Sequence, residues 1–180
     1  MRPAKKLKRA IDKFFYDYKL YFVYGDYVDM ISKKTKYGLT ALIHLSQRYQ
    51  RGPVLIEDLA KREALPKKFL ETILLELKNK GILHSKKGKG GGYSLGKSPQ
   101  DITLGQAIRI LEGPLAPVSC VSQSAYRKCE ECRDEEICGI RIVMKEVRDA
   151  MSNILDHTSL ADVLKKIEAQ GSGRSLEYFI

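Results

Sequence analysis

The sequence predicts a mostly α-helical fold with one small β-hairpin, arranged as a winged helix-turn-helix domain followed by a long helix. Three observations predict it. Apolar residues recur at helical spacing in two segments joined by a short turn, between residues 57 and 80. A hairpin rich in lysine and glycine follows them directly. Nearer the C-terminus, apolar residues recur at alternating intervals of four and three, which is typical of helices that pair.

The helix-turn-helix is predicted to consist of three helices. Apolar periodicity favours the first over residues 36–50, and the sequence Arg51-Gly52-Pro53 ends it, because proline disfavours a helical residue before it. A short second helix is predicted over residues 57–63. The turn Ala64-Leu65-Pro66 leads into the third helix, and Pro66 suits the first position of that helix.

The third helix carries a buried stripe and is followed by the hairpin. Its apolar residues fall at i, i+3, i+4 and i+7, and they are Leu70, Ile73, Leu74 and Leu77. Gly81 supplies the stop. Residues 82–86 and 93–95 are predicted to pair as two strands, joined by a flexible glycine-rich tip at residues 87–92. Another helix is expected over residues 103–111, which completes a DNA-binding domain at residues 30–112.

A loop at residues 113–138, which contains the cysteines, connects this domain to a predicted dimerisation region at residues 139–168. The seam of that region consists of Ile140, Met144, Val147, Met151 and Ile154. Their spacing favours pairing with a second copy of the same helix, and a helix packed on its own domain is the alternative. A short last helix is expected at residues 160–167, followed by a flexible tail at residues 169–180.

Residues 1–29 differ in composition from the rest of the chain. This basic segment contains eight of the chain's fifteen aromatic residues, namely Phe14, Phe15, Tyr16, Tyr18, Tyr21, Phe22, Tyr24 and Tyr27. Met30 then opens a stretch that reads like an ordinary bacterial protein start. Two interpretations follow: an arm that packs on a partner, or a start assigned too far upstream.

The positive charge of the chain is concentrated in the predicted DNA-binding domain. Residues 30–112 contain 16 Lys and Arg against 7 Asp and Glu, or +9, whereas residues 113–180 contain 9 against 11, or −2. Residues 1–29 contribute the remaining +3 of the net +10. This asymmetry indicates a domain that binds a polyanion, joined to a part with another role.

Two groups of residues are predicted to contact DNA. The third helix presents Lys67, Lys68 and Glu71 near its N-terminus, the end that meets base edges in helix-turn-helix proteins. Lys68 suits guanine or phosphate, and Glu71 suits a cytosine amine, although a solvated helix surface is the plain alternative. The hairpin tip carries Lys86, Lys87 and Lys89, whose charges suit phosphates or a narrow minor groove.

A P-loop pattern overlaps the hairpin, from Gly91 to Gly96-Lys97-Ser98. A functional P-loop follows a buried strand and opens a helix, whereas Ser98 leads into Pro99-Gln100-Asp101. Nucleotide hydrolysis is therefore not expected, and the chain is predicted not to be an enzyme.

The cysteines are spaced as a possible metal site. Cys120, Cys129, Cys132 and Cys138 lie within one segment. Four thiolates suit either an iron–sulfur cluster or tetrahedral zinc, and four free thiols without metal are the third possibility. No apolar run approaches the roughly 20 residues needed to cross a bilayer, and no signal peptide is recognisable. A cytoplasmic protein with reduced thiols and no membrane contact is expected.

Taken together, the winged helix and the cysteine loop resemble the IscR/NsrR-type winged-helix transcriptional regulators of bacteria. The resemblance covers about residues 30–168 and rests on the motifs KYGLTAL, EDLA, KGKGGGY and SPQDITLGQAIRILEG in that order. It implies a homodimer that binds a palindromic operator in double-stranded DNA. It further implies base contacts at Lys68, Phe69 and Glu71 and wing contacts at Lys87 and Gly88.

The same resemblance implies that the cysteines hold an iron–sulfur cluster that reports redox state, nitric oxide or iron–sulfur status. The chain departs from the family pattern at Arg141, where the best-known cluster-binding members have a histidine ligand. An additional cysteine makes an all-cysteine site possible. The predicted function is a homodimeric transcriptional regulator that senses through this cluster. A regulator with structural zinc or no metal, and a zinc-stabilised RNA-binding module, are the alternatives.

Overall fold

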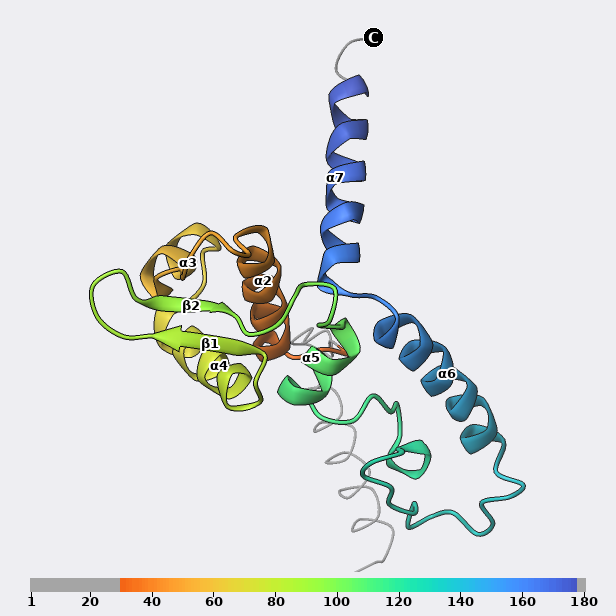
Figure 1. Ribbon diagram of the computed structural model, residues 1–180. Coiled ribbons are helices and arrows are strands. Elements are labelled where there is room, and N and C mark those ends of the chain that lie inside the picture. Colours follow the sequence, from red (N-terminus) through yellow and green to blue (C-terminus); the bar gives the residue numbers. More distant parts are fainter. Residues whose placement is uncertain (1–29, 178–180) are drawn as a thin grey trace, which may run out of the picture. The chain divides into compact units, whose positions relative to one another are not determined.

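The computed structural model describes the backbone of residues 30–177 and the side chains up to residue 171. The predicted aromatic and basic extension at residues 1–29 lies outside the described residues. Residues 31–180 form one unit, in which helices α2 to α5 and a hairpin are followed by the two longer helices α6 and α7 (Figure 1). The prediction of a mostly α-helical fold with one small hairpin is confirmed.

Helices α2 (Lys33–Gln47), α3 (Ile56–Arg62) and α4 (Lys67–Asn79) form the helix-turn-helix. The Ser32 side chain accepts a hydrogen bond from the Thr35 backbone amide and so satisfies one free donor at the start of α2. The predicted stripe of α4 is confirmed, because all four of its side chains are fully buried. The apolar faces of α2 and α3 pack on this stripe and form the core.

The wing is an antiparallel hairpin of β1 (Leu83–Lys86) and β2 (Gly92–Leu95), with Leu83 opposite Leu95 and Lys86 opposite Gly92. A feature that the periodicity does not indicate is the bridge between Val54 and Tyr93, in which each amide donates to the other's carbonyl at 2.8 Å. This bridge ties the base of the wing to the strand-like residue before α3. It requires glycine at position 92, where a Cβ atom would lie 2.2 Å from the Val54 carbonyl oxygen.

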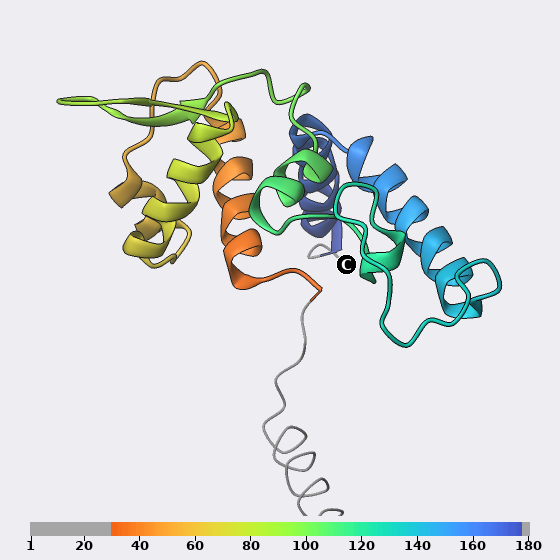
Figure 2. The same ribbon diagram turned by 90° about the horizontal axis from the view of Figure 1, so that it is seen from below.

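Helix α5 (Leu104–Leu111) packs against α2 and α4 and leads into the cysteine segment, which contains the short 3-10 helix η1 (Ser119–Val121). Helix α6 (Gly139–Asp156) then runs back along α5 and η1 (Figure 2). Arg109 of α5 donates two hydrogen bonds to Asp156, at 2.5 and 2.8 Å, and anchors the C-terminal end of α6. The described helices include none that is long and apolar enough to cross a membrane.

Helix α7 (Leu160–Glu177) is longer than predicted. Leu160 is fully buried and α7 contacts α2, so the first turn of α7 belongs to the core. The segment expected to be a flexible tail is helical through Glu177, and only residues 178–180 of it lie outside the described part. Each residue added to an existing helix forms one more hydrogen bond and loses only its own conformational freedom. Gly171 and Gly173 each destabilise the helix by about 1 kcal/mol relative to alanine, which need not end α7.

Candidate nucleic-acid interface and cysteine cluster

The first turns of α4 present the predicted DNA-contacting side chains to solvent. Lys67, Lys68, Phe69 and Glu71 are all exposed, whereas Leu70, Ile73, Leu74 and Leu77 of the same helix are buried. Lys67 pairs with Glu57 of α3, and the hydrogen bond between them raises the pKa of Lys67 and lowers that of Glu57. Among the described residues Lys68 has no ion-pair partner, so its ammonium group is available to a phosphate or a guanine.

Phe69 contacts an aromatic side chain that the sequence prediction did not include. Its ring meets the ring of Tyr37, on α2, edge to face, with centroids 5.8 Å apart and planes at 86°. Tyr37 is half-buried and packs against the core, whereas Phe69 remains 42% exposed. The first turn of α4 thus presents a large, partly exposed apolar ring that Tyr37 supports on its core side. Aromatic residues in two helices give no pairwise signal in a single sequence, so this contact could not be predicted from periodicity.

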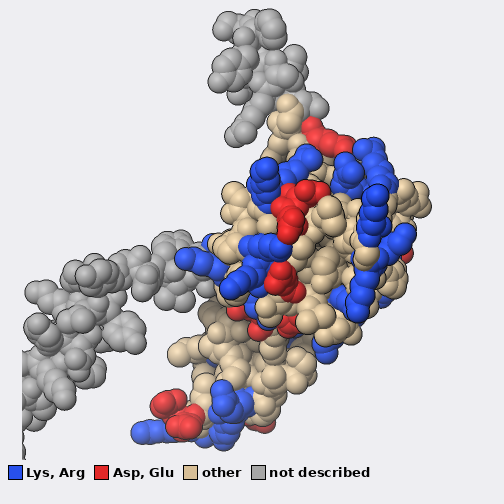
Figure 3. Space-filling model, turned by 90° about the vertical axis from the view of Figure 1, so that its left-hand side faces the viewer, with Lys and Arg blue, Asp and Glu red and all other residues tan. Residues whose placement is uncertain are grey.

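The wing presents an exposed basic tip. Lys86, Lys87, Gly88 and Lys89 are all exposed, and none of the three lysines has an ion-pair partner in the part of the chain that the structure describes. The turn at the tip needs positive φ values, 87° at Gly88 and 74° at Gly90. Glycine adopts this left-handed backbone conformation readily, whereas other residues rarely do. Figure 3, viewed from this side of the domain, shows a band of Lys and Arg side chains that includes few acidic groups. The three exposed lysines give the tip of the wing a positive surface.

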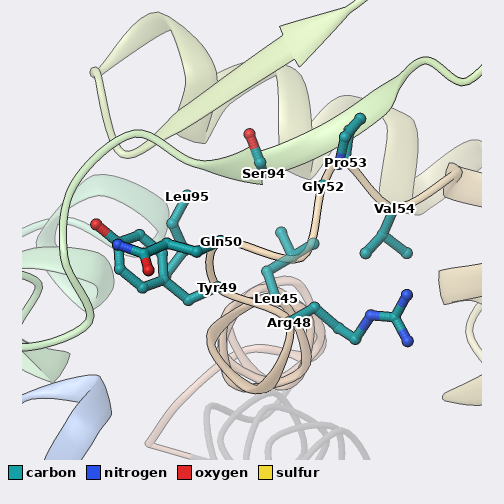
Figure 4. A pocket seen from close by; sticks show the side chains of 9 residues that line it. All are labelled: Leu45, Arg48, Tyr49, Gln50, Gly52, Pro53, Val54, Ser94 and Leu95. Carbon is teal, nitrogen blue, oxygen red and sulfur yellow. The ribbon is translucent and has the colours of Figure 1, made fainter.

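A hollow of about 280 Å³ separates the base of the wing from the C-terminal end of α2 (Figure 4). Its lining is apolar at Leu45, Val54 and Leu95 and polar at Gln50, which has a φ of 62°, and at Ser94. Ligand-binding pockets usually measure roughly 300–1,000 Å³ and enclose most of their ligand. This hollow is near the lower end of that range and is partly open to solvent.

The four thiols are arranged as two neighbouring pairs. Cys120 is buried on η1, and Cys129, Cys132 and Cys138 are half-buried. A hydrogen bond with the Cys120 thiol raises the pKa of Cys129, with smaller contributions from the charge of Cys120 and from burial. Burial, and then a hydrogen bond with Cys138, raise the pKa of Cys132. Raised pKa values favour the protonated thiols at neutral pH, so metal binding would have to release protons.

The described residues include no group of three or more side chains already arranged to hold a metal ion. The donor set still fits a soft metal, because four free thiols lie within residues 120–138. Within this loop the Tyr126 hydroxyl donates a hydrogen bond of 2.5 Å to the Glu135 carboxylate, and this bond raises the pKa of Tyr126.

Two arginines of α6 hold the backbone of the cysteine segment. Arg148 donates to the Val121 carbonyl oxygen at 2.6 Å, and Arg141 donates to the Cys120 carbonyl oxygen at 3.4 Å. Arg141 occupies the position that the resemblance assigns to a histidine ligand, and here it contacts the backbone next to a thiol. The sequence shows that Arg141 cannot be a ligand, but only the structure shows what it binds instead.

The predicted seam of α6 is only partly covered in a single chain. No side chain of α6 is fully buried in the described part of the molecule. Ile140 is 70% exposed, Ile154 is 64% exposed, and Val147 is also exposed, whereas Met144 and Met151 are half-buried. Val143 adds a further exposed apolar side chain beside them. An amphipathic helix with this much uncovered apolar surface favours contact with another protein surface.

A winged helix-turn-helix with exposed lysines on its wing is typical of DNA-binding proteins. Comparisons with known proteins identify a family of transcriptional regulators. A model of the Rrf2 family, described as an iron-dependent transcriptional regulator, matches residues 31–166, and the chain belongs to this family. It is 42% identical over 138 residues to an rrf2-like HTH-type transcriptional regulator of Rhodobacter capsulatus, a match that covers 75% of this chain and 92% of the relative. The predicted family resemblance is confirmed, and the relatives are regulators rather than enzymes.

Two solved structures are similar in fold. The global cysteine regulator CymR of B. subtilis is 34% identical, covers 77% of this chain and 98% of its own, and has a TM-score of 0.65. IscR of T. potens is 31% identical, covers 81% and 94% respectively, and has a TM-score of 0.63. Each of these two matches covers more of the chain than the DNA-binding domain at residues 30–112 contains.

Proposed function

We propose that this Rrf2-family regulator binds a palindromic operator as a homodimer and that the state of its cysteines controls the binding. The DNA surface consists of the α4 side chains Lys67, Lys68, Phe69 and Glu71 together with the wing residues Lys86, Lys87, Gly88 and Lys89. Exposure, the absence of acidic partners for most of these lysines within the described residues, and the positive face in Figure 3 support this assignment. The protein acts in the cytoplasm, where its thiols stay reduced.

The observation that carries the control mechanism is the contact of Arg141 and Arg148 with the backbone at Cys120 and Val121. Through these bonds the segment that carries a thiol is attached to the helix that carries the seam. A change at the cysteines that moves this backbone shifts α6, and with it the distance between the two wings of a dimer. Each of the two states then favours a different spacing of half-sites, which is how a local event alters operator affinity.

An iron–sulfur cluster is the group that the cysteines are proposed to hold, with zinc as the alternative. Cys120, Cys129, Cys132 and Cys138 would supply the four thiolate ligands. A bound cluster would supply redox chemistry and sensitivity to nitric oxide. The cysteines would release their thiol protons when they bind the cluster. Arg141 and Arg148 connect the backbone at Cys120 and Val121 to α6.

A test begins with protein purified without oxygen. Stoichiometric iron and sulfide would support the cluster, and zinc without sulfide would replace it by a structural metal. Loss of operator binding on metal removal, restored on reloading, is expected for the proposed sensor. Tight binding to a duplex operator with identical affinity in all metal and redox states would exclude sensing at the cysteines. A preference for single-stranded RNA over duplex DNA would support the RNA-binding alternative.

A second candidate signal is direct oxidation of Cys120 and Cys129, because these two thiols interact, although the raised pKa of Cys129 disfavours the reactive thiolate. In that reaction the two thiols form one disulfide and transfer two electrons and two protons to a disulfide oxidant such as oxidised glutathione, which leaves as two thiols. Metal-free protein that gains one internal disulfide, seen as the loss of two hydrogens by mass spectrometry, and then changes operator affinity would support it. Unchanged affinity after this oxidation would exclude it.

A further inference from the structure

The pair formed by Phe69 and Tyr37 has chemistry that the charged residues of the DNA surface do not provide. The buried stripe of α4 is fully covered, yet Phe69 keeps 42% of its surface in solvent, one position after Lys68. Leaving a large aromatic ring exposed forgoes the stabilisation that its burial would bring. The ring is also held in place, because Tyr37 meets it edge to face from the core side.

We propose that Phe69 contacts the 5-methyl group of a thymine in the major groove and that Tyr37 positions the Phe69 ring for this contact. Among the base edges in the major groove, the thymine methyl is the apolar one, and apolar side chains such as phenylalanine recognise it. Lys68 is next in sequence and is also exposed, so a phosphate or guanine contact of Lys68 would bring the first turn of α4, and with it the Phe69 ring, close to the DNA. This inference rests on the proposed binding of duplex DNA and adds one base preference to it.

The geometry distinguishes Phe69 from Leu75, the other exposed large apolar side chain of α4. Phe69 lies in the first turn, the end of a recognition helix that enters the groove. Leu75 lies six residues further along, about 9 Å along the axis at 1.5 Å per residue. Leu75 is therefore a matched control of similar exposure on the same helix.

The test uses the dimeric protein and a duplex selected from random sequence by the wild-type chain. Each thymine in the duplex is replaced in turn by deoxyuridine, which removes only the methyl group. We expect one position per half-site at which wild-type affinity falls about threefold to tenfold, the scale of losing one buried methyl contact. Phe69→Ala should bind the thymine and deoxyuridine duplexes equally at that position, whereas Leu75→Ala should keep the wild-type ratio.

Tyr37 is tested with two substitutions. Tyr37→Phe keeps the edge-to-face contact and should retain the thymine preference, whereas Tyr37→Leu should reduce it. Circular dichroism and thermal unfolding identify any variant that fails to fold, and the deoxyuridine scan of the wild-type chain decides the proposal without any variant. A selected duplex that shows no sensitivity to deoxyuridine, or whose sensitivity disappears with Leu75 instead of Phe69, would overturn it. Failure to select any duplex would instead count against the proposed function.

Discussion

Arg148 of α6 donates a hydrogen bond of 2.6 Å to the carbonyl oxygen of Val121, the residue that follows Cys120. The Arg148 side chain is 11% exposed, and its guanidinium group also pairs with Asp149. A bond between a charged donor and a backbone carbonyl in a nearly buried site holds the η1 segment against α6 more firmly than a surface ion pair would. Arg141 adds a second, longer bond to the neighbouring carbonyl.

Replacing Arg148 should free the cysteine segment from α6. Arg148→Ala is expected to lower the free energy of unfolding by about 1–3 kcal/mol, because it leaves the Val121 carbonyl without its charged donor. Amide hydrogen exchange should become faster around η1, while exchange in α4 stays unchanged. Arg133→Ala, at an exposed arginine of the same segment, is the control and should change neither quantity. Equal exchange in wild type and Arg148→Ala would mean that this bond does not hold η1.

The seam of α6 makes the oligomeric state sensitive to charge. Ile154→Asp introduces a carboxylate at the C-terminal end of the seam, where Ile154 is 64% exposed in a single chain, so a dimer that uses this seam should dissociate. Sedimentation velocity measures the outcome, and Lys145→Glu, at an exposed position on another side of α6, should leave the dimer intact. A wild-type chain that sediments as a monomer would refute the assignment of this seam, as would an unchanged dimer in Ile154→Asp.

The wing and the recognition helix should differ in what they contribute to DNA binding. Lys87→Ala removes an exposed cation at the tip, so it should weaken binding about equally on all sequences and flatten the salt dependence of the affinity. Glu71→Ala should instead relax discrimination at one base position, by roughly 1–3 kcal/mol. Fluorescence anisotropy at several salt concentrations, on operator and random duplexes, separates the two effects. Identical losses on both duplexes for both variants would contradict this division.

Glu112 connects the end of α5 to the start of α2, and this contact should make stability depend on pH. Its Oε2 accepts hydrogen bonds of 2.6 Å from both the Ser32 and the Thr35 hydroxyl groups. These bonds, that from Ser32 first, lower the pKa of Glu112 below its ordinary value of 4.5. The Glu112 carboxylate therefore binds a proton more readily in the unfolded chain than in the folded chain. The stabilisation is present above pH 4.5 and is lost as the pH falls through the lower pKa of the folded state.

Urea unfolding of the wild type and of Glu112→Gln between pH 3 and pH 7 tests this linkage. The difference in stability between the two chains should be largest near neutral pH and should shrink as the pH falls below 4.5. Glu130→Gln, at an exposed glutamate of the cysteine loop, serves as the control with no expected difference. A difference that stays constant over the whole range would show that the charge of Glu112 is not the cause.

Gly92 should be intolerant of substitution because of the bridge between Val54 and Tyr93. Its φ is 136°, and a Cβ atom would lie within 2.5 Å of both the carbonyl carbon and the carbonyl oxygen of Val54. Gly92→Ala should therefore break the bridge, lower the unfolding free energy by about 1–3 kcal/mol and reduce DNA affinity by displacing the wing. Gly139→Ala is the matched control, because a Cβ there meets nothing within 4 Å. A Gly92→Ala protein as stable as the wild type would refute the close packing at the wing base.

Local patterns predicted most of the helix-turn-helix and its wing. Leu70, Ile73, Leu74 and Leu77 show the helical period, and the glycines between Lys87 and Tyr93 permit the turn, so both elements could be predicted within a few residues of their observed bounds. The length of α7 was underestimated, because composition alone made its glycine-containing end resemble a flexible tail.

The contacts that connect the parts could not be predicted in this way. Glu112 reaches Ser32 across 80 residues, and Arg148 reaches Val121 across 27. No periodicity records such pairs, since their spacing in the sequence is set by the connections between elements. The same holds for Tyr37 and Phe69, which lie on different helices.

The sequence by itself determined which residues form helices and strands, where the positive charge is concentrated, and that four thiols share one segment. These properties depend on neighbouring residues, through side-chain period, turn preference and composition. Only the tertiary structure decided that Cys120 lies beside Cys129, that Arg141 and Arg148 hold the backbone next to the thiol, and that Phe69 rests on Tyr37 while facing solvent. Those relationships depend on the packing of α2, α4, η1 and α6 against one another, which a residue's neighbours in the sequence do not specify.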